Sequence, residues 1–342
     1  MSIYSNQDIV CSVCIANYNG ANVLEACLDS VFRQDFPQSI EVIVHDDAST
    51  DGSVTIVTEK YPAVRLLKSE TNVGFCVSNN RMVAVAKGKF ILLLNNDAEL
   101  RGDALSVLYN YTVQANVCGV VGLPQYSRET GELLDMGSLF DPFLNPIPNQ
   151  NDSRRDVGMV IGACMWLSKQ LWEELGGFPE WFESLAEDMY LCCRARLKGY
   201  PVIALAASGF DHWVGSNLGG GKVIRRKLQT TYRRRALSER NKSYVMFLCY
   251  PVILAHVLIP LHLLFLALEG LLLSAVKKEG RIWREIYRPC FAALWCNRNK
   301  LIRLRRAIQA GRRVSLIAFY SAHTFLPHKL TMLMKYGVPT LK

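Results

Sequence analysis

The last third of this 342-residue chain has almost no acidic residues. Residues 223–342 carry 23 Lys and Arg but only 4 Asp and Glu, a net charge of +19. Residues 1–222 have the opposite balance, with 16 Lys and Arg against 26 Asp and Glu, a net charge of −10. This asymmetry predicts two parts: an acidic catalytic or binding domain over residues 1–222, and a basic segment over residues 223–342 that meets an anionic partner.

Three common signals are also missing. The N-terminus has no basic start and no long apolar stretch, so we expect no secretory signal and a first domain that stays in the cytoplasm. The first predicted strand–helix turn lacks Gly-x-Gly-x-x-Gly, which argues against a dinucleotide-binding dehydrogenase. The 11 Cys residues follow no Cys/His metal-ligand spacing, so we expect reduced thiols rather than a disulfide framework.

The most informative stretch that is present is Phe90-Ile-Leu-Leu-Leu94. Five apolar residues without polar alternation are typical of a strand buried on both faces, as in a parallel sheet covered by helices. The run stops abruptly at Asn95-Asn96-Asp97. Because ligands of open α/β sheets bind outside the carboxyl ends of the strands, these polar residues are candidates for a metal or substrate site.

Similar apolar runs alternate with helical patterns along residues 1–222. Strands are predicted at 9–15, 41–44, 64–67 and 90–94, and helices at 23–32, 54–61, 79–86, 169–175 and 187–198. This alternation predicts an α/β fold with a doubly wound, mostly parallel sheet and helices on both faces. The proline-containing region 117–156 is predicted to form loops and edge strands.

Polar clusters follow several of these strands or start helices. They are residues 16–20, 46–51, 95–97 and 187–188, with His212 as a further candidate. Each one alone is typical of a turn or a helix cap. Together, in a register that brings them to one sheet edge, they predict a site for a divalent cation and a diphosphate. Carboxylates suit Mg²⁺ or Mn²⁺, and an imidazole nitrogen suits Mn²⁺ better.

The ordered set of motifs resembles family 2 glycosyltransferases of the GT-A fold over residues 9–215, and within them the bacterial rhamnosyltransferase-like branch that assembles surface polysaccharides. The motifs are Ser12–Asn19, Val42–Ser53, Asn72–Phe75, Asn79-Asn80, Lys87-Gly88, Leu94–Asp97, Gly176–Phe178, Glu187–Leu191, Arg194 and Gly199-Tyr200. The later Glu239-Arg240-Asn241-Lys242 and the basic stretch 298–313 are similar to that branch too.

The resemblance implies roles for the residues of the first domain. The donor would be a UDP-, dTDP- or GDP-linked sugar, and its nucleoside would lie against Ala16, Asn17, Tyr18, Asp47 and Asn96, with Asn96 at the ribose. Asp97 would bind the cation that bridges the diphosphate, Mn²⁺ or Mg²⁺. His212 would be a further ligand, and Asn95 takes the first position of the Asp-x-Asp motif, where an amide is a weaker ligand.

The same resemblance makes Asp188 the general base and gives Glu187 the role of orienting the acceptor or the base. One base without a protein nucleophile implies a single displacement with inversion. A simpler explanation of both carboxylates is a helix start, where acidic side chains interact favourably with the helix dipole, and the two explanations are compatible.

Residues 252–276 are mostly apolar and would form a helix of roughly 37 Å, enough for a bilayer core of about 30 Å. Basic residues flank the run on both sides, so the positive-inside rule favours a re-entrant hairpin bent near Pro260, or helices lying in the interface, over a single span. The basic stretch 298–313 carries no nucleic-acid-binding motif, so anionic lipid is the expected partner. We therefore expect a location at the cytoplasmic face of the inner or plasma membrane. The resemblance to the glycosyltransferase family implies a lipid-linked glycan as acceptor, which a basic, membrane-facing region would suit.

Other functions remain open from the sequence alone. A nucleotidyltransferase would share the α/β sheet, and a membrane-bound scaffold without catalysis would retain the fold, with Asn95 in place of an aspartate as its support. A processive polysaccharide synthase is disfavoured, since Gln229-Thr-Thr-Tyr-Arg233 does not supply the Gln-x-x-Arg-Trp motif.

Overall fold

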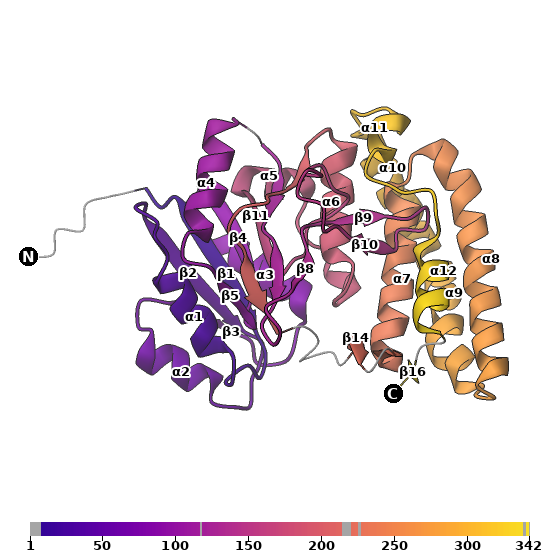
Figure 1. Ribbon diagram of the computed structural model, residues 1–342, viewed down its shortest axis with the longest axis horizontal. Helices are drawn as coiled ribbons and strands as arrows, with labels where there is room; N and C mark the ends of the chain where they lie inside the picture. Colours follow the sequence, from indigo (N-terminus) through magenta and orange to yellow (C-terminus); the bar gives the residue numbers. More distant parts are fainter. Residues whose placement is uncertain (1–7, 117, 214–219, 225–226, 338–339, 342) are drawn as a thin grey trace, which may run out of the picture. The chain divides into compact units, whose positions relative to one another are not determined.

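The computed structural model describes residues 8–116, 118–213, 220–224, 227–337 and 340–341 (Figure 1). The chain divides into two compact units. The first comprises Met1–Gly137, Pro148–Ser184 and Tyr200–Trp213, and the second comprises Ser138–Ile147, Leu185–Gly199 and Val214–Lys342. The domain boundary expected at residue 222 stays a prediction.

A seven-stranded sheet forms the centre of the first unit, in the order β12-β6-β11-β4-β1-β2-β3. The strands are β1 (Cys11–Asn17), β2 (Ile40–Asp46), β3 (Arg65–Lys68), β4 (Phe90–Asn95), β6 (Val120–Gly122), β11 (Cys164–Ser168) and β12 (Val202–Ala204). Strand β4 pairs in parallel with β1 and antiparallel with β11. The predicted mixed α/β fold with a mostly parallel sheet is therefore confirmed. The sequence pattern did not predict β11 and β12.

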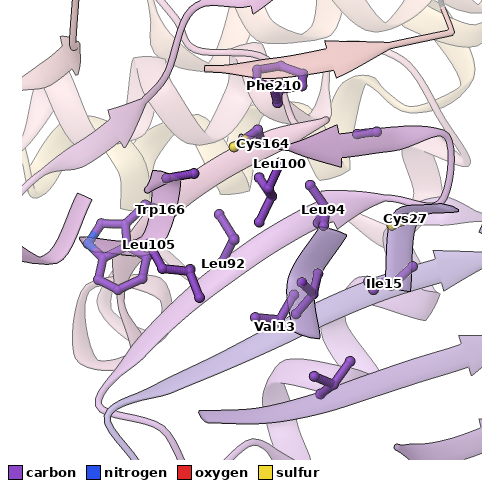
Figure 2. Packing of buried hydrophobic residues seen from close by; sticks show 14 of the residues in the cluster. Val13, Ile15, Cys27, Leu92, Leu94, Leu100, Leu105, Cys164, Trp166 and Phe210 are labelled. Atoms are coloured by element: carbon purple, nitrogen blue, oxygen red, sulfur yellow. The ribbon is translucent and has the colours of Figure 1, made fainter. Parts of the chain in front are cut away.

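Strand β4 is buried on both faces, as its uniform apolar run predicts. Phe90, Leu92 and Leu94 pack in one core with α1 (Leu24–Phe32) and α4 (Ala104–Gln114), and Figure 2 shows part of this packing. Ile91 and Leu93 point to the opposite face because side chains alternate along a strand, and both are fully buried. The helices α2 (Ser53–Lys60), α3 (Phe75–Val85) and α5 (Lys169–Leu175) complete the first unit.

A smaller sheet of the first unit has the order β5-β13-β7-β8. Its strands are β5 (Ala98–Leu100), β7 (Gln125–Ser127), β8 (Leu133–Asp135) and β13 (Phe210–His212). Strand β13 runs antiparallel to β5 and parallel to β7, so His212 lies opposite Ala98 and Ser127. This register places His212 beside the residue that precedes Ala98, which is Asp97.

The second unit is mainly helical. Its helices are α6 (Glu187–Leu197), α7 (Tyr232–Cys249), α8 (Val252–Val276), α9 (Arg288–Cys296), α10 (Arg298–Ala310), α11 (Leu316–Tyr320) and α12 (His328–Tyr336), with a π-turn at Trp283–Tyr287. Short strands are β9 (Ser138–Phe140), β10 (Pro146–Pro148), β14 (Gly220–Ile224), β15 (Lys227–Thr230) and β16 (Thr340–Leu341). Helix α7 packs against α6, α8, α9 and α10, and its middle is buried.

The apolar run 252–276 forms one continuous helix, α8, with Pro260 inside it. The hairpin bent near Pro260, one of the alternatives expected from the sequence, is therefore wrong. A proline removes one backbone hydrogen bond and often kinks a helix, but neighbouring packing can carry the helix through it. Within the described parts of the chain, α8 is the one helix long and apolar enough to cross a bilayer.

Candidate functional site

The carboxyl ends of β1, β2 and β4 bring three polar side chains together in the first unit. The Asn17 amide donates to Asp46 Oδ1 at 3.0 Å, and the Asn96 amide donates to Asn17 Oδ1 at 2.8 Å. The parallel register explains the meeting, since Asn17 lies opposite Asp46, and Ala16 opposite Asn95. All three side chains are buried. The result is a fixed amide relay at the sheet edge where α/β folds bind ligands.

Gly20 is required by the close packing of this relay. A Cβ atom at this position would lie 2.2 Å from Asn96 Nδ2 and 2.3 Å from Asn17 Oδ1. The Gly20 N–H also donates to Ser53 Oγ at 3.1 Å, which ties the turn after β1 to the start of α2. An Asn-Gly pair such as Asn19-Gly20 is typical of a turn, but only the structure shows that a side chain at Gly20 would displace the amide relay.

The other predicted donor-binding residues flank the same strand ends. Both carboxylate oxygens of Asp47 accept backbone N–H bonds, from Val73 at 2.7 Å and from Gly74 at 2.9 Å. Asp47 therefore braces the 72–74 loop, and a nucleobase contact would use its remaining acceptor sites. The Tyr18 side chain is 46% exposed next to this edge. The donor contacts of Ala16, Asn17, Tyr18, Asp47 and Asn96 stay predictions.

The predicted metal ligands Asn95, Asp97 and His212 also come together in the first unit. His212 Nε2 lies 3.0 Å from Asp97 Oδ1, and Asn95 Nδ2 lies 3.5 Å from the same ring nitrogen. Asp97 and His212 are each 7% exposed. The amide oxygen of Asn95 is buried and has no hydrogen-bond partner, although a buried amide oxygen normally has one.

Gln125 on β7 completes this cluster, and no sequence motif indicated its role. Its Nε2 atom lies 2.8 Å from His212 Nδ1, so the imidazole is held between Gln125 on one side and Asp97 on the other. The pairing of β13 with β7 brings the two residues together across 87 positions of the chain. No local pattern encodes that pairing, which is why Gln125 was missed.

Asp97, His212 and Asn95 are residues whose side chains can ligate a divalent cation. Within the described ranges, no group of three His, Cys, Asp or Glu side chains could hold a metal ion. Asp97 and His212 supply a carboxylate oxygen and an imidazole nitrogen, and the unpaired amide oxygen of Asn95 supplies a third donor. A donor set of two oxygens and one nitrogen would suit Mn²⁺ or Mg²⁺.

The predicted base and its neighbour, Asp188 and Glu187, belong to the second unit and form the first turn of α6. Glu187 is buried, and burial, with the charge of Asp188 as the second cause, raises the pKa of Glu187 to about 8. The positive charge of Arg234 of α7 lowers the pKa of Glu187, but less than burial and the charge of Asp188 raise it. Glu187 therefore keeps a proton at neutral pH, and Asp188 is the more exposed of the two.

One segment of the chain matches a known protein family. Residues 12–176 match the sequence model of the family described as Glycosyl transferase family 2. This segment is a glycosyl transferase family 2 domain. The match covers the strands β1, β2 and β4 together with Asn17, Asn96 and Asp97. It confirms the resemblance drawn from the sequence motifs, and with it the prediction of a glycosyltransferase domain.

Two curated relatives are similar over part of the chain. The uncharacterized glycosyltransferase YibD of Escherichia coli K12 is 38% identical over 168 residues, which cover 47% of this chain and 45% of YibD. The N-acetylglucosaminyl-diphospho-decaprenol L-rhamnosyltransferase of Mycobacterium tuberculosis is 22% identical over 241 residues, 61% of this chain and 74% of that enzyme. The chain therefore spans less than half of the length of YibD.

The fold is also similar to that of solved glycosyltransferases. The mannosyltransferase PcManGT of Pyrobaculum calidifontis, solved in complex with GDP-Man and Mn²⁺, has a TM-score of 0.53 and 20% identity. The similarity covers 93% of this chain and 90% of that one. At this level of identity it shows a shared fold, which confirms the predicted GT-A-like architecture.

Proposed function

We propose that the protein transfers a sugar from a nucleotide-sugar to a hydroxyl group, with a divalent cation at Asp97, His212 and Asn95. The observation that carries the proposal is the meeting of Asp97, His212 and the Asn95 amide in a family 2 domain that also holds the amide relay at its strand ends. The Asn95 amide oxygen is buried and has no hydrogen-bond partner, so it is available as a further ligand. The Mn²⁺ and GDP-Man bound by the P. calidifontis neighbour support it.

The amide relay would receive the nucleoside part of the donor. Asn96 and Asn17 are locked by their mutual hydrogen bond and by Asp46, so their remaining polar atoms are already oriented when the donor arrives. Preorganised groups of this kind lose little conformational entropy on binding. The exposed ring of Tyr18 is suited to lie against a nucleobase.

The cation would be held by Asp97 Oδ1, His212 Nε2 and Asn95 Oδ1. When bound, a divalent cation neutralises the negative charge that develops on the departing diphosphate. His212 can ligate only through an unprotonated Nε2, so its proton has to reside on Nδ1. Gln125 can stabilise that tautomer by turning its amide oxygen towards Nδ1, where the oxygen accepts the Nδ1–H hydrogen bond. The turn is possible because the two ends of an amide are nearly equal in shape.

The carboxylate pair of α6 would orient and deprotonate the acceptor hydroxyl. Asp188 takes the proton of the attacking hydroxyl as the new glycosidic bond forms, and the bond from the sugar to the diphosphate breaks. Glu187, which keeps its own proton at neutral pH, can donate a hydrogen bond that orients Asp188 or the hydroxyl. One base and no protein nucleophile give a single displacement with inversion of configuration.

The second unit offers a surface suited to a lipid membrane. Helix α8 turns His262 and Glu269 inward, where His262 contacts Ser243, and Glu269 contacts Arg235 and Lys329. Its outward face is an exposed apolar stripe, made of Ile253, Val257, Leu261, Leu264, Leu268, Leu271 and Leu272. Such a helix suits the membrane interface better than a single span, because its buried polar contacts hold it against the protein.

The basic excess of residues 223–342 complements the anionic cytoplasmic leaflet, which supports location at that face. We also propose that the acceptor is a lipid-linked glycan in bacterial surface polysaccharide synthesis. The name of the M. tuberculosis relative, which includes diphospho-decaprenol, is consistent with such an acceptor.

Alkaline carbonate extraction of membranes tests how the protein is attached to the membrane. An interfacial α8 is released with the protein, whereas retention in the lipid fraction would indicate a span.

A panel of UDP-, dTDP- and GDP-sugars, each with Mn²⁺, tests the function through the thermal shift of the protein. We expect one nucleotide class to raise the melting temperature in a Mn²⁺-dependent manner, because ligands that bind the folded state stabilise it. A flat response to every donor would contradict the proposal. A separate assay with a nucleoside triphosphate and a sugar phosphate tests the alternative, because release of pyrophosphate from that pair would instead indicate a nucleotidyltransferase.

A further inference from the structure

The two residues before the Glu187-Asp188 pair adopt an unusual backbone conformation. Leu185 has φ 73° and Ala186 has φ 65°, and neither is a glycine. The left-handed region is costly for residues with a Cβ atom, and it persists only where the surrounding structure enforces it. Ala186 is also the N-cap of α6, and its carbonyl accepts from the Tyr190 N–H at 2.9 Å. The strained turn therefore sets where α6 begins and how its first two carboxylates are presented.

Asn241 of α7 is the side chain that holds this turn. Its Nδ2 atom donates to the Leu185 carbonyl at 2.8 Å, and Asn241 is completely buried. The amide cannot turn over freely, because Arg240 Nε donates to its Oδ1 at 2.9 Å. A fixed donor aimed at the carbonyl of a left-handed residue is the kind of support that such a turn requires.

The same helix also faces the carboxylates directly. Arg234 precedes Asn241 by seven residues, two helical turns, so both lie on one face of α7. Arg234 acts on the charges of Glu187 and Asp188, while Asn241 acts on the backbone just before them. One helix thus controls both the position and the electrostatics of the pair, with all of these residues in the second unit.

We propose that Asn241 is a positioning residue for transfer: it keeps the Leu185-Ala186 turn left-handed and so holds the Glu187-Asp188 pair in its working geometry. This inference rests on the proposed role of Asp188 as the base. It assigns to the Glu239-Arg240-Asn241-Lys242 stretch a task in catalysis that requires no contact of Asn241 with a substrate.

The test uses the full chain and four variants: Asn241→Ala, Ala186→Gly, the two combined, and Asn297→Ala as a matched control. Asn297 is another amide of the second unit, and it donates to Tyr244 of α7 at 3.2 Å and to the Ala293 carbonyl at 2.9 Å. Donor affinity, kcat and KM for transfer, and melting temperature are measured for each variant. Asn241→Asp, which has nearly the same size but no amide donor, replaces Asn241→Ala if the alanine variant does not fold.

We expect Asn241→Ala to lower kcat at least tenfold and to leave donor affinity within twofold, because the donor residues lie in the other unit. Glycine adopts positive φ without a steric cost, so Ala186→Gly alone should be nearly neutral. In the Asn241→Ala background it should recover at least a third of the lost kcat. Asn297→Ala should lower the melting temperature while kcat stays within twofold of the wild type.

A readout that needs no transfer keeps this inference separate from the proposed function. The pH dependence of unfolding that Glu187 produces should flatten in Asn241→Ala, because a relaxed turn exposes that side chain. If the wild type shows no transfer, the proposed function fails. The pH dependence of unfolding then tests by itself whether Asn241 holds the Leu185-Ala186 turn. Unchanged kcat and unchanged pH dependence in a folded Asn241→Ala protein would overturn the inference, as would equal losses of kcat in Asn241→Ala and Asn297→Ala.

Discussion

His212 Nε2 lies 3.0 Å from Asp97 Oδ1, although the two residues are 115 positions apart in the chain. The antiparallel pairing of β13 with β5 sets His212 opposite Ala98, and the Trp213 N–H donates to the Asp97 carbonyl at 3.1 Å. Backbone pairing thus fixes both ligands before any cation binds. This preorganisation is the structural basis of the proposed metal site.

Substitution of Gln125 should change the metal affinity without changing a ligand. Gln125→Ala leaves His212 Nδ1 without its partner at 2.8 Å, so we expect Mn²⁺ to bind about 10-fold more weakly. Gln125→Glu should retain or improve the affinity, because a carboxylate favours the proton on Nδ1 and frees Nε2. Isothermal titration with Mn²⁺ measures both. Equal Mn²⁺ affinities in all three proteins would show that Gln125 does not support the metal site.

Alanine at Gly20 should disrupt the amide relay. The added Cβ would fall 2.2 Å from Asn96 Nδ2, so Asn96 and Asn17 have to separate. We expect donor affinity to fall about 10-fold, which corresponds to roughly 1.4 kcal/mol. Gly102→Ala is the matched control, since a Cβ there meets nothing within 4 Å. If both variants bind the donor equally, the relay does not contact it.

The stability of the protein should depend on pH through Glu187. Burial raises the pKa of Glu187 from 4.5 to about 8, so the folded protein keeps a proton that the unfolded chain releases. The contribution of Glu187 to stability is complete below about pH 4.5 and is lost as the pH rises through 8. We expect the wild type to lose more stability than Glu187→Gln between pH 5 and pH 8 in urea unfolding. Parallel pH profiles would show that Glu187 is not held protonated.

Asp188→Asn should separate donor binding from transfer. The amide keeps the size of the side chain but cannot accept the proton of the acceptor hydroxyl. Loss of general-base catalysis is typically worth about 10²- to 10⁴-fold in rate, and donor affinity should stay the same. Initial rates of transfer and donor titration measure the two effects. Near-normal transfer by Asp188→Asn would assign the base to another residue.

Local sequence patterns predicted much of this fold because the information they need is local. The apolar run Phe90–Leu94 identified a strand buried on both faces, and the polar residues after it identified the edge where Asn96 and Asp97 lie. The charge asymmetry and the apolar run 252–276 likewise identified a basic region with one apolar helix. Each of these predictions depends on residues within a few positions of one another.

The parts that escaped prediction depend on distant pairings. The antiparallel strand β11, the contact of Gln125 with His212 and the bond from Asn241 to Leu185 each join segments dozens of residues apart. The apolar composition of β11 does not indicate its antiparallel direction, because parallel and antiparallel core strands bury the same residue types. The continuity of α8 through Pro260 was also hidden, since tertiary packing overrode the local preference.

The claim that catalysis requires a cation at Asp97 is tested by the release of nucleoside diphosphate from a nucleotide-sugar, measured with and without Mn²⁺. We expect release that EDTA stops, that Mn²⁺ restores, and that falls by about 10²- to 10³-fold in Asp97→Ala. Asn95→Ala, which removes a neutral and weaker ligand, should only reduce the rate and raise the Mn²⁺ concentration required. Release that is indifferent to EDTA and to Asp97→Ala would contradict the claim.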